Sequence, residues 1–143
     1  MQLRNMTVDD CAAVAALEKE IFTMPWSKEA FLDALTWNYE YVVAEEQGKI
    51  LGYCGMSCVL DEGEIPKICV AESARRRGFA RAMLEAMEKT ARQRGVRTLF
   101  LEVRQSNQAA RRLYQSVGFE ETGTRKGFYE QPKEDAVLMQ KTL

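Results

Sequence analysis

An arginine-rich run of six residues, from Arg75 to Ala80, offers the most direct chemistry in this sequence. It lies between a short apolar run at 68–70 and a long helical pattern, so a strand is predicted to feed a turn that opens a helix. The first amides of a helix lack intrahelical partners and carry the positive end of its dipole, and arginine side chains match phosphate oxygens. Gly78 lets the backbone approach a ligand closely. The run therefore indicates an anion site, with a solvated basic helix start as an equally supported alternative on these six residues alone.

Two further residues could carry acid or base chemistry, because the chain has no histidine and so lacks Ser-His-Asp and Cys-His catalysis. Glu102 shares one face of a predicted strand with Phe100, since side chains alternate along a strand. On this strand alone, the favoured explanation of the acid is a strand end in water, or a pair with Arg97 or Arg104. Tyr114 lies on the apolar stripe of a predicted helix, where tyrosine is more often core packing with a satisfied hydroxyl than an acid.

The composition is that of an ordinary globular protein. The 143 residues, 46% hydrophobic and 29% charged, predict one domain over 1–143. The N-terminus does not resemble a signal peptide and no run is long enough to cross a bilayer, so we expect a cytoplasmic protein without a membrane partner. The four cysteines form no Cys-x-x-Cys pair and there is no histidine, so we expect reduced, buried thiols and no metal.

Charge is unevenly distributed along the chain although its net value is −1. Residues 75–112 hold ten arginines and one lysine against three glutamates, a net +8, and the remainder carries −9. This arrangement could steer a polyanion to one edge and a cationic substrate to another. The pI of about 5.7 argues against general coating of nucleic acid, and uneven surface charge without function stays an alternative.

Strand and helix patterns alternate along the chain, which predicts an α/β fold. Strands are predicted at 2–6, 41–45, 50–60, 68–70, 99–104, 119–129 and 135–142. Helices are predicted to begin after Thr7, at Ser27, after the arginine-rich run and at Asn107, with Gly95 and Gly118 ending the last two. Turns are predicted at Gln47-Gly48, at 61–63 and near Pro132-Lys133. The strand at 68–70 and the strand at 99–104 both lead into helices, and ligands bind beyond such strand ends, so both transitions indicate one site.

The order of these motifs resembles the acetyl-CoA-dependent N-acetyltransferases of the Gcn5-related superfamily. Within it, Leu-Glu-Val-Arg-x-Ser-Asn at 101–107, Met-Pro-Trp-Ser at 24–27 and Glu-Asp-Ala at 134–136 resemble the bacterial ribosomal-protein alanine N-acetyltransferases. The resemblance covers essentially the whole chain. It implies a mixed, mostly antiparallel sheet of about seven strands with about four helices on both faces, splayed between the strand of Ile68 and the strand of Glu102.

The resemblance also implies the roles of individual residues. Glu102 would be the general base, Tyr114 the general acid, and Trp26 and Tyr129 would border the acceptor groove. The residues implied in binding acetyl-CoA are Ile68, Cys69, Val70, Arg75, Arg76, Arg77, Gly78, Phe79, Ala80, Arg81 and Asn107. Two departures stand out. Pro66-Lys67 replaces an apolar residue and a polar amide residue, which predicts a bulged strand start, and Phe128-Tyr129 keeps one hydroxyl where relatives often have two tyrosines.

The function implied by the resemblance is acetyl transfer to a protein N-terminal α-amine, an alanine on a small-subunit ribosomal protein. A small-molecule amine such as a polyamine or aminoglycoside, or a lysine side chain, is the nearest alternative acceptor. A module that senses coenzyme A without turnover, or an RNA-associated protein, are alternatives of a different class. We expect no direct nucleic-acid partner and a monomer or weak dimer.

Overall fold

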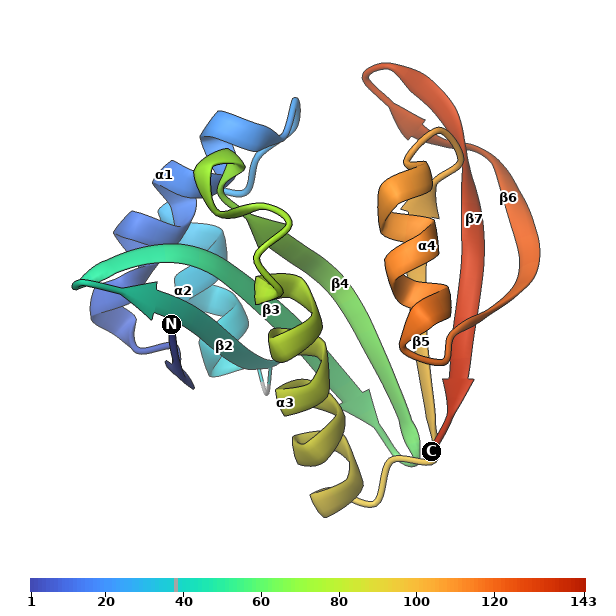
Figure 1. Ribbon diagram of the computed structural model, residues 1–143, viewed down its shortest axis with the longest axis horizontal. Helices are drawn as coiled ribbons and strands as arrows, with labels where there is room; N and C mark the ends of the chain where they lie inside the picture. The colour runs from blue at the N-terminus through green and yellow to red at the C-terminus, as the bar shows by residue number, and fades with distance from the viewer. Residues whose placement is uncertain (38) are drawn as a thin grey trace.

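Seven strands form one sheet in a computed structural model that describes residues 1–37 and 39–143 (Figure 1). The strands are β1 (Gln2–Asn5), β2 (Tyr39–Glu46), β3 (Lys49–Val59), β4 (Glu62–Val70), β5 (Thr98–Arg104), β6 (Glu120–Glu130) and β7 (Lys133–Thr142). Their order across the sheet is β1-β2-β3-β4-β5-β7-β6. Neighbours are antiparallel except for the parallel pair β4 and β5. The predicted mixed, mostly antiparallel sheet is confirmed.

Four α-helices cover the two faces of this sheet (Figure 1). They are α1 (Cys11–Ile21), α2 (Lys28–Thr36), α3 (Phe79–Gln93) and α4 (Gln108–Ser116), with short 3-10 turns at Val8–Asp10 and Glu72–Ala74. The helices α1 and α2 pack on one face around Phe31, Tyr41 and Tyr53. The helices α3 and α4 pack on the other face around Met83 and Leu99. Within the described residues, no helix is long and apolar enough to cross a membrane.

The predicted helix starts and stops are confirmed where a short-range signal encoded them. The Ser27 hydroxyl accepts a hydrogen bond from the Ala30 N–H at 3.2 Å and caps α2. The Asn107 side chain caps α4 in the same way, through the Ala110 N–H at 3.1 Å. Gly95 follows α3 with a φ of +79°, a left-handed conformation that ends a helix.

One predicted turn is wrong. Residues 61–63 were expected to close the hairpin, but the turn is Leu60-Asp61, and Glu62 pairs with Val59 as the first residue of β4. Gly63 is a packing glycine, because a Cβ there would lie 2.8 Å from the Leu99 side chain. Smaller corrections concern the last hairpin, which turns at 131–132 rather than at 132–133, and Cys58, which is half-buried whereas the other three cysteines are buried.

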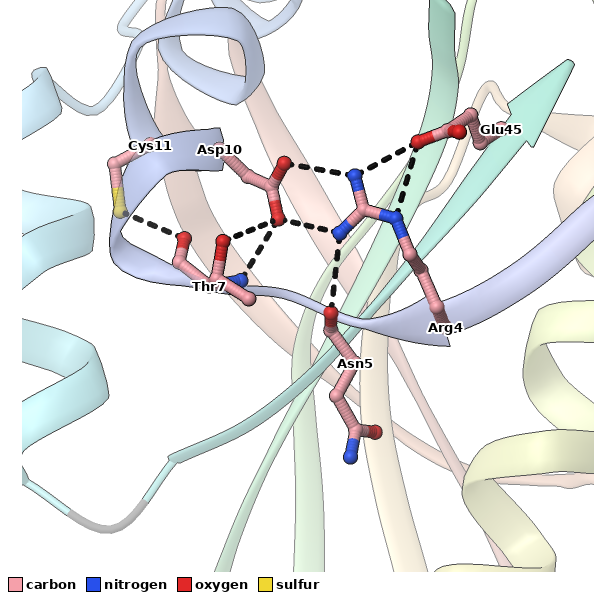
Figure 2. A network of polar contacts seen from close by, with 6 residues as sticks. All are labelled: Arg4, Asn5, Thr7, Asp10, Cys11 and Glu45. Carbon is pink, nitrogen blue, oxygen red and sulfur yellow. Dashed lines mark hydrogen bonds and ion pairs between the residues drawn. The ribbon is translucent and has the colours of Figure 1, made fainter. Parts of the chain in front are cut away.

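An ion-pair network anchors the first strand to the start of α1 (Figure 2). The Arg4 guanidinium donates to both oxygens of Asp10 at 2.7 and 2.9 Å, and to Glu45 of β2 at 2.7 and 3.0 Å. The Thr7 N–H donates to the same Asp10 carboxylate at 2.8 Å. The Arg4 guanidinium lowers the pKa of Asp10 to about 2. The network therefore ties the 3-10 turn that leads into α1 to both β1 and β2.

The sheet splits between its two central strands. Parallel pairing joins Glu62–Ile65 of β4 only to Thr98–Leu101 of β5. Figure 1 shows the two strands meeting near the C-terminus and diverging away from it. The predicted splay is therefore confirmed.

A β-bulge lies where the split begins. Ile65 and Pro66 together face the single residue Met56 of β3, so the predicted distortion at Pro66 is confirmed, although it falls within β4 rather than at its start. Residues four apart in a regular strand share a face. Ile65 instead packs on the α3 side and Cys69 on the α1 side. The bulge thus turns the second half of β4 so that Lys67 and Cys69 lie on the α1 side.

Candidate active site

The split between β4 and β5 opens into a cavity of about 380 Å³. We call it the acceptor-side cavity, after the acceptor groove that the resemblance implies. Its walls come from both strands, from the loop between α1 and α2, and from the β6–β7 hairpin. The Thr23 hydroxyl of that loop donates to the Gln131 carbonyl of the hairpin, which joins the two walls. The lining of the cavity includes Lys67, Ile68, Glu102, Asn107, Tyr114 and Tyr129.

Glu102 places a carboxylate in the acceptor-side cavity. Along β5, Leu101 and Val103 are buried on the α3 side, so Glu102 lies on the opposite face with 25% of its side chain exposed. Burial raises the pKa of Glu102, while the Arg125 guanidinium of β6, 3.3 Å away, acts in the opposite direction. Its ion-pair partner is thus Arg125 rather than Arg97 or Arg104. A carboxylate with a raised pKa is a better base than one in water.

Tyr114 lies in α4 beside the same cavity and is only 6% exposed. Its ring meets the ring of Phe119 edge-on at 6.1 Å between centroids. Burial raises the pKa of the Tyr114 hydroxyl above its usual value. The hydroxyl therefore stays protonated at neutral pH, the state that a proton donor needs.

A second cavity, of about 720 Å³, continues from the first. The two share Ile68, Asn107 and Tyr114 among their lining residues. Beyond Ile65, the edge of β4 that faces the split has no strand partner in the described part of the chain. This second cavity extends from that edge to the start of α3. We call it the phosphate-side cavity, after the anion site that the arginine-rich run predicts.

The arginine-rich run forms the far wall of the phosphate-side cavity. Arg76 and Gly78 both have left-handed backbones, with φ of +62° and +84°. The Ala82 N–H donates to the Gly78 carbonyl, so the amides before it at Phe79, Ala80 and Arg81 have no intrahelical carbonyl to bond. The predicted turn at a helix start is confirmed as a structure, and its amides are available to an anion.

Not all of the predicted arginines meet at this wall. Arg75, Arg76 and Arg81 line the cavity, and the Arg81 guanidinium also donates to the Ser116 hydroxyl at 2.8 Å. Arg77 lies outside the lining and pairs with Glu46 of β2 at 2.7 Å. The other residues predicted to bind acetyl-CoA line the cavity: Ile68, Cys69, Val70, Gly78, Phe79, Ala80 and Asn107.

The two predicted acceptor-side aromatics lie differently. Tyr129 lines the acceptor-side cavity, with the Arg104 guanidinium 4.3 Å from its ring centre. Burial raises the pKa of Tyr129 to about 12. Trp26 is absent from the described lining and packs its ring on Phe31 at 5.5 Å. It approaches the cavity through Lys67, whose ammonium lies 4.7 Å from the Trp26 ring centre.

Sequence reasoning missed the pair formed by Glu18 of α1 and Lys67 of β4. The Glu18 carboxylate is fully buried, and the Lys67 ammonium lies 3.2 Å from it. A signal existed in the helix, since position 18 follows Cys11 by seven residues and Val14 by four and therefore belongs to the apolar stripe. An acid on an apolar stripe indicates a buried partner.

Known proteins resemble this chain in both sequence and fold. Residues 11–119 match the acetyltransferase (GNAT) family. The [ribosomal protein bS18]-alanine N-acetyltransferase of Escherichia coli (strain K12) is 34% identical over 139 residues, which cover 96% of this chain and 94% of that protein. The enzyme of that name from Haemophilus ducreyi is 35% identical over 140 residues, covering 96% and 97%. The crystal structure of the ribosomal-protein-S18-alanine N-acetyltransferase from Escherichia coli matches with a TM-score of 0.91 and 33% identity, covering 99% of this chain and 92% of that one.

Proposed function

This chain belongs to the acetyltransferase (GNAT) family, and from that membership we propose that it acetylates a protein N-terminal α-amine with acetyl-CoA as the donor. We propose an N-terminal alanine of a small-subunit ribosomal protein as the acceptor, because relatives matched over nearly their whole length are named for that activity. The observation that carries the proposal is Glu102, a half-buried carboxylate at the point where two central strands part.

The phosphate-side cavity fits the cosubstrate chemically. The pantetheine arm of acetyl-CoA carries amide groups, which suit the unpartnered β4 edge at Ile68–Val70. Its phosphates suit the amides at the start of α3 together with Arg75, Arg76 and Arg81. Asn107 lines both cavities and so would contact the coenzyme near the thioester.

An α-amine is the easier acceptor for this site. At pH 7, removing its proton costs roughly 1 to 1.4 kcal/mol, against roughly 4.6 kcal/mol for a lysine side chain, from their reference pKa values. Glu102, made more basic by burial, takes that proton directly or through a water. The amine nitrogen then bonds to the carbonyl carbon of the thioester.

Direct transfer follows from the remaining groups. As the C–N bond forms and the C–S bond breaks, the departing thiolate takes a proton from the Tyr114 hydroxyl, which is restored from solvent. Cys69 is unsuited to carry the acetyl group, because burial raises the pKa of its thiol to about 12 and keeps it protonated.

The test uses acetyl-CoA and peptides that begin with alanine. One peptide has a free α-amine and a blocked lysine, a second has a blocked α-amine and a free lysine, and a polyamine is the third acceptor. We expect acetylation and thiol release only with the free α-amine, read by mass spectrometry. Acetylation confined to lysine or to the polyamine would reject the assignment, and binding of coenzyme A without thiol release would indicate a non-catalytic module.

The arginine placement predicts a difference between neighbours in the run. Arg76→Asn is expected to raise the Kd for coenzyme A roughly tenfold or more, since it removes a charged donor at the phosphates. Asparagine tolerates the left-handed backbone at this position. Arg77→Asn is the matched control, because Arg77 pairs with Glu46 outside the cavity, and its Kd should change much less. Titration calorimetry at low salt measures both, and equal losses would contradict the placement.

A further inference from the structure

The buried carboxylate of Glu18 in α1 gathers groups from three other segments beside the acceptor-side cavity. It accepts hydrogen bonds from the Tyr53 hydroxyl of β3 and from the Trp26 N–H of the α1–α2 loop. Its third partner is the Lys67 ammonium of β4, at 3.2 Å. A fully buried charge is tolerated only with such partners. The acetyl-transfer steps above use none of these groups.

Lys67 is the member of the network that reaches the cavity. It lines the acceptor-side cavity, and 14% of its side chain is exposed. Its ammonium lies 4.7 Å from the ring centre of Trp26 and 5.3 Å from that of Phe22, so two aromatic faces and the Glu18 carboxylate hold it in one place. The bulge at Ile65–Pro66 turns Lys67 to this side of the sheet. The ammonium is therefore a fixed donor at the cavity wall.

The chemistry of this donor indicates what it binds. A lysine ammonium has three N–H donors, and Glu18 is its one carboxylate partner among the described residues. Because Glu18 neutralises its charge, Lys67 suits a neutral acceptor such as a carbonyl oxygen better than a second carboxylate. Lys67 lies two residues beyond the last paired residue of β4, Glu102 lies one residue beyond that of β5, and both line the acceptor-side cavity. In a peptide, the α-amine and the first carbonyl are bonded to the same Cα atom. The first carbonyl of a peptide whose amine is held at Glu102 therefore lies close to that amine.

We propose that Lys67 binds the first carbonyl oxygen of the acceptor and that Glu18 positions its ammonium for this contact. The inference rests on the proposed function and specifies its acceptors as amines with an adjacent carbonyl, the α-aminoacyl group of a peptide. Simple alkylamines and polyamines lack that carbonyl and lose the hydrogen bond. Lys67 is then a substrate-binding residue and Glu18 a positioning residue.

The experiment compares two acceptors that differ in one atom group. The first is a peptide beginning with alanine, and the second is its analogue in which a trans alkene replaces the first amide and removes the carbonyl. Wild-type protein should acetylate the amide peptide with a kcat/KM roughly tenfold higher, as expected for one hydrogen bond to a charged group. Lys67→Met should abolish this preference and leave the KM for acetyl-CoA unchanged, and Lys67→Arg should retain part of it.

Two further variants separate recognition from folding. Lys67→Met alone leaves Glu18 buried without its cation, so the double variant Glu18→Gln, Lys67→Met removes both charges and should also lose the preference. Lys89→Met, at an exposed position of α3, is the matched control and should behave as wild type. Thermal melting checks that each variant is folded.

The possible failures are distinct. No preference in wild-type protein, or a preference retained in the folded double variant, would overturn the role of Lys67 while leaving α-amine acetylation intact. Acetylation of neither acceptor by wild-type protein would overturn the proposed function and, with it, this inference.

Discussion

Glu102→Gln is expected to lower kcat/KM for the acceptor peptide by about 10²–10⁴-fold while the Kd for acetyl-CoA stays within about twofold. Glutamine keeps the size of the side chain but cannot take a proton. The proposed cosubstrate contacts line the phosphate-side cavity, and Glu102 is not among the described residues of that lining. Steady-state kinetics with a peptide beginning with alanine, together with calorimetric binding, measure both quantities. Unchanged turnover would remove Glu102 from its role.

The pH profile gives this prediction a second readout. A carboxylate can accept a proton only when it is deprotonated, so with Glu102 as the proposed base kcat/KM should fall as the pH drops through its raised pKa. That acidic limb should be absent from the Glu102→Gln variant, whereas titration of the acceptor amine affects both proteins alike. Glu64→Gln is the matched control, because the negative charge of Glu64 raises the pKa of Glu102. Its removal should move the limb to lower pH at full activity, and a limb retained without Glu102 would contradict the assignment.

Tyr114→Phe is expected to lower kcat by roughly 10²-fold, the lower end of the range for general acid catalysis. Phenylalanine preserves the ring packing against Phe119, so folding and acetyl-CoA affinity should be retained. Burial raises the pKa of Tyr114 above the unperturbed tyrosine pKa of about 10. Ionisation of Tyr114 should therefore cause no loss of wild-type activity up to about pH 10.

A matched change controls for the loss of a buried tyrosine hydroxyl. Tyr41 is buried on the other face of the sheet, among α1 and α2, and lines neither cavity in the described residues. Tyr41→Phe should therefore keep its kcat. Single-turnover measurements at saturating substrates compare the two variants. An unchanged rate in Tyr114→Phe would contradict the role of Tyr114 and indicate that water is the proton donor.

The elements of the fold could be predicted where neighbours in sequence determine them. Ser27, Asn107 and Gly95 act on residues within one turn of themselves, so their signals were readable. Gly63 could not be predicted in this way, because it is glycine in order to leave room for the Leu99 side chain of another strand. A turn glycine and a packing glycine look alike until the partner strand is known.

The candidate site also combines features that the sequence predicts with features that depend on contacts between distant residues. The order of the motifs assigned Glu102, Tyr114 and the arginine-rich run to one site, and these residues, with the exception of Arg77, line the two cavities. It could not distinguish Arg76 from Arg77, because the backbone conformation of the turn decides which side chain faces the cavity. The pair of Glu18 and Lys67 joins positions 49 residues apart through a bulge. Only the folded chain brings them together.

The short pairing between β4 and β5 affects how the protein responds when a substrate binds. Four residue pairs connect one block of strands, β1 to β4, with the other, β5 to β7. A molecule bonded to the free edges of both blocks would act as a missing strand, so its binding free energy would add to the cohesion of the sheet. Amide hydrogen exchange along Ile68–Val70 and at the far end of β5 should then slow when coenzyme A is present, which would make the stiffness of the enzyme a measure of its occupancy.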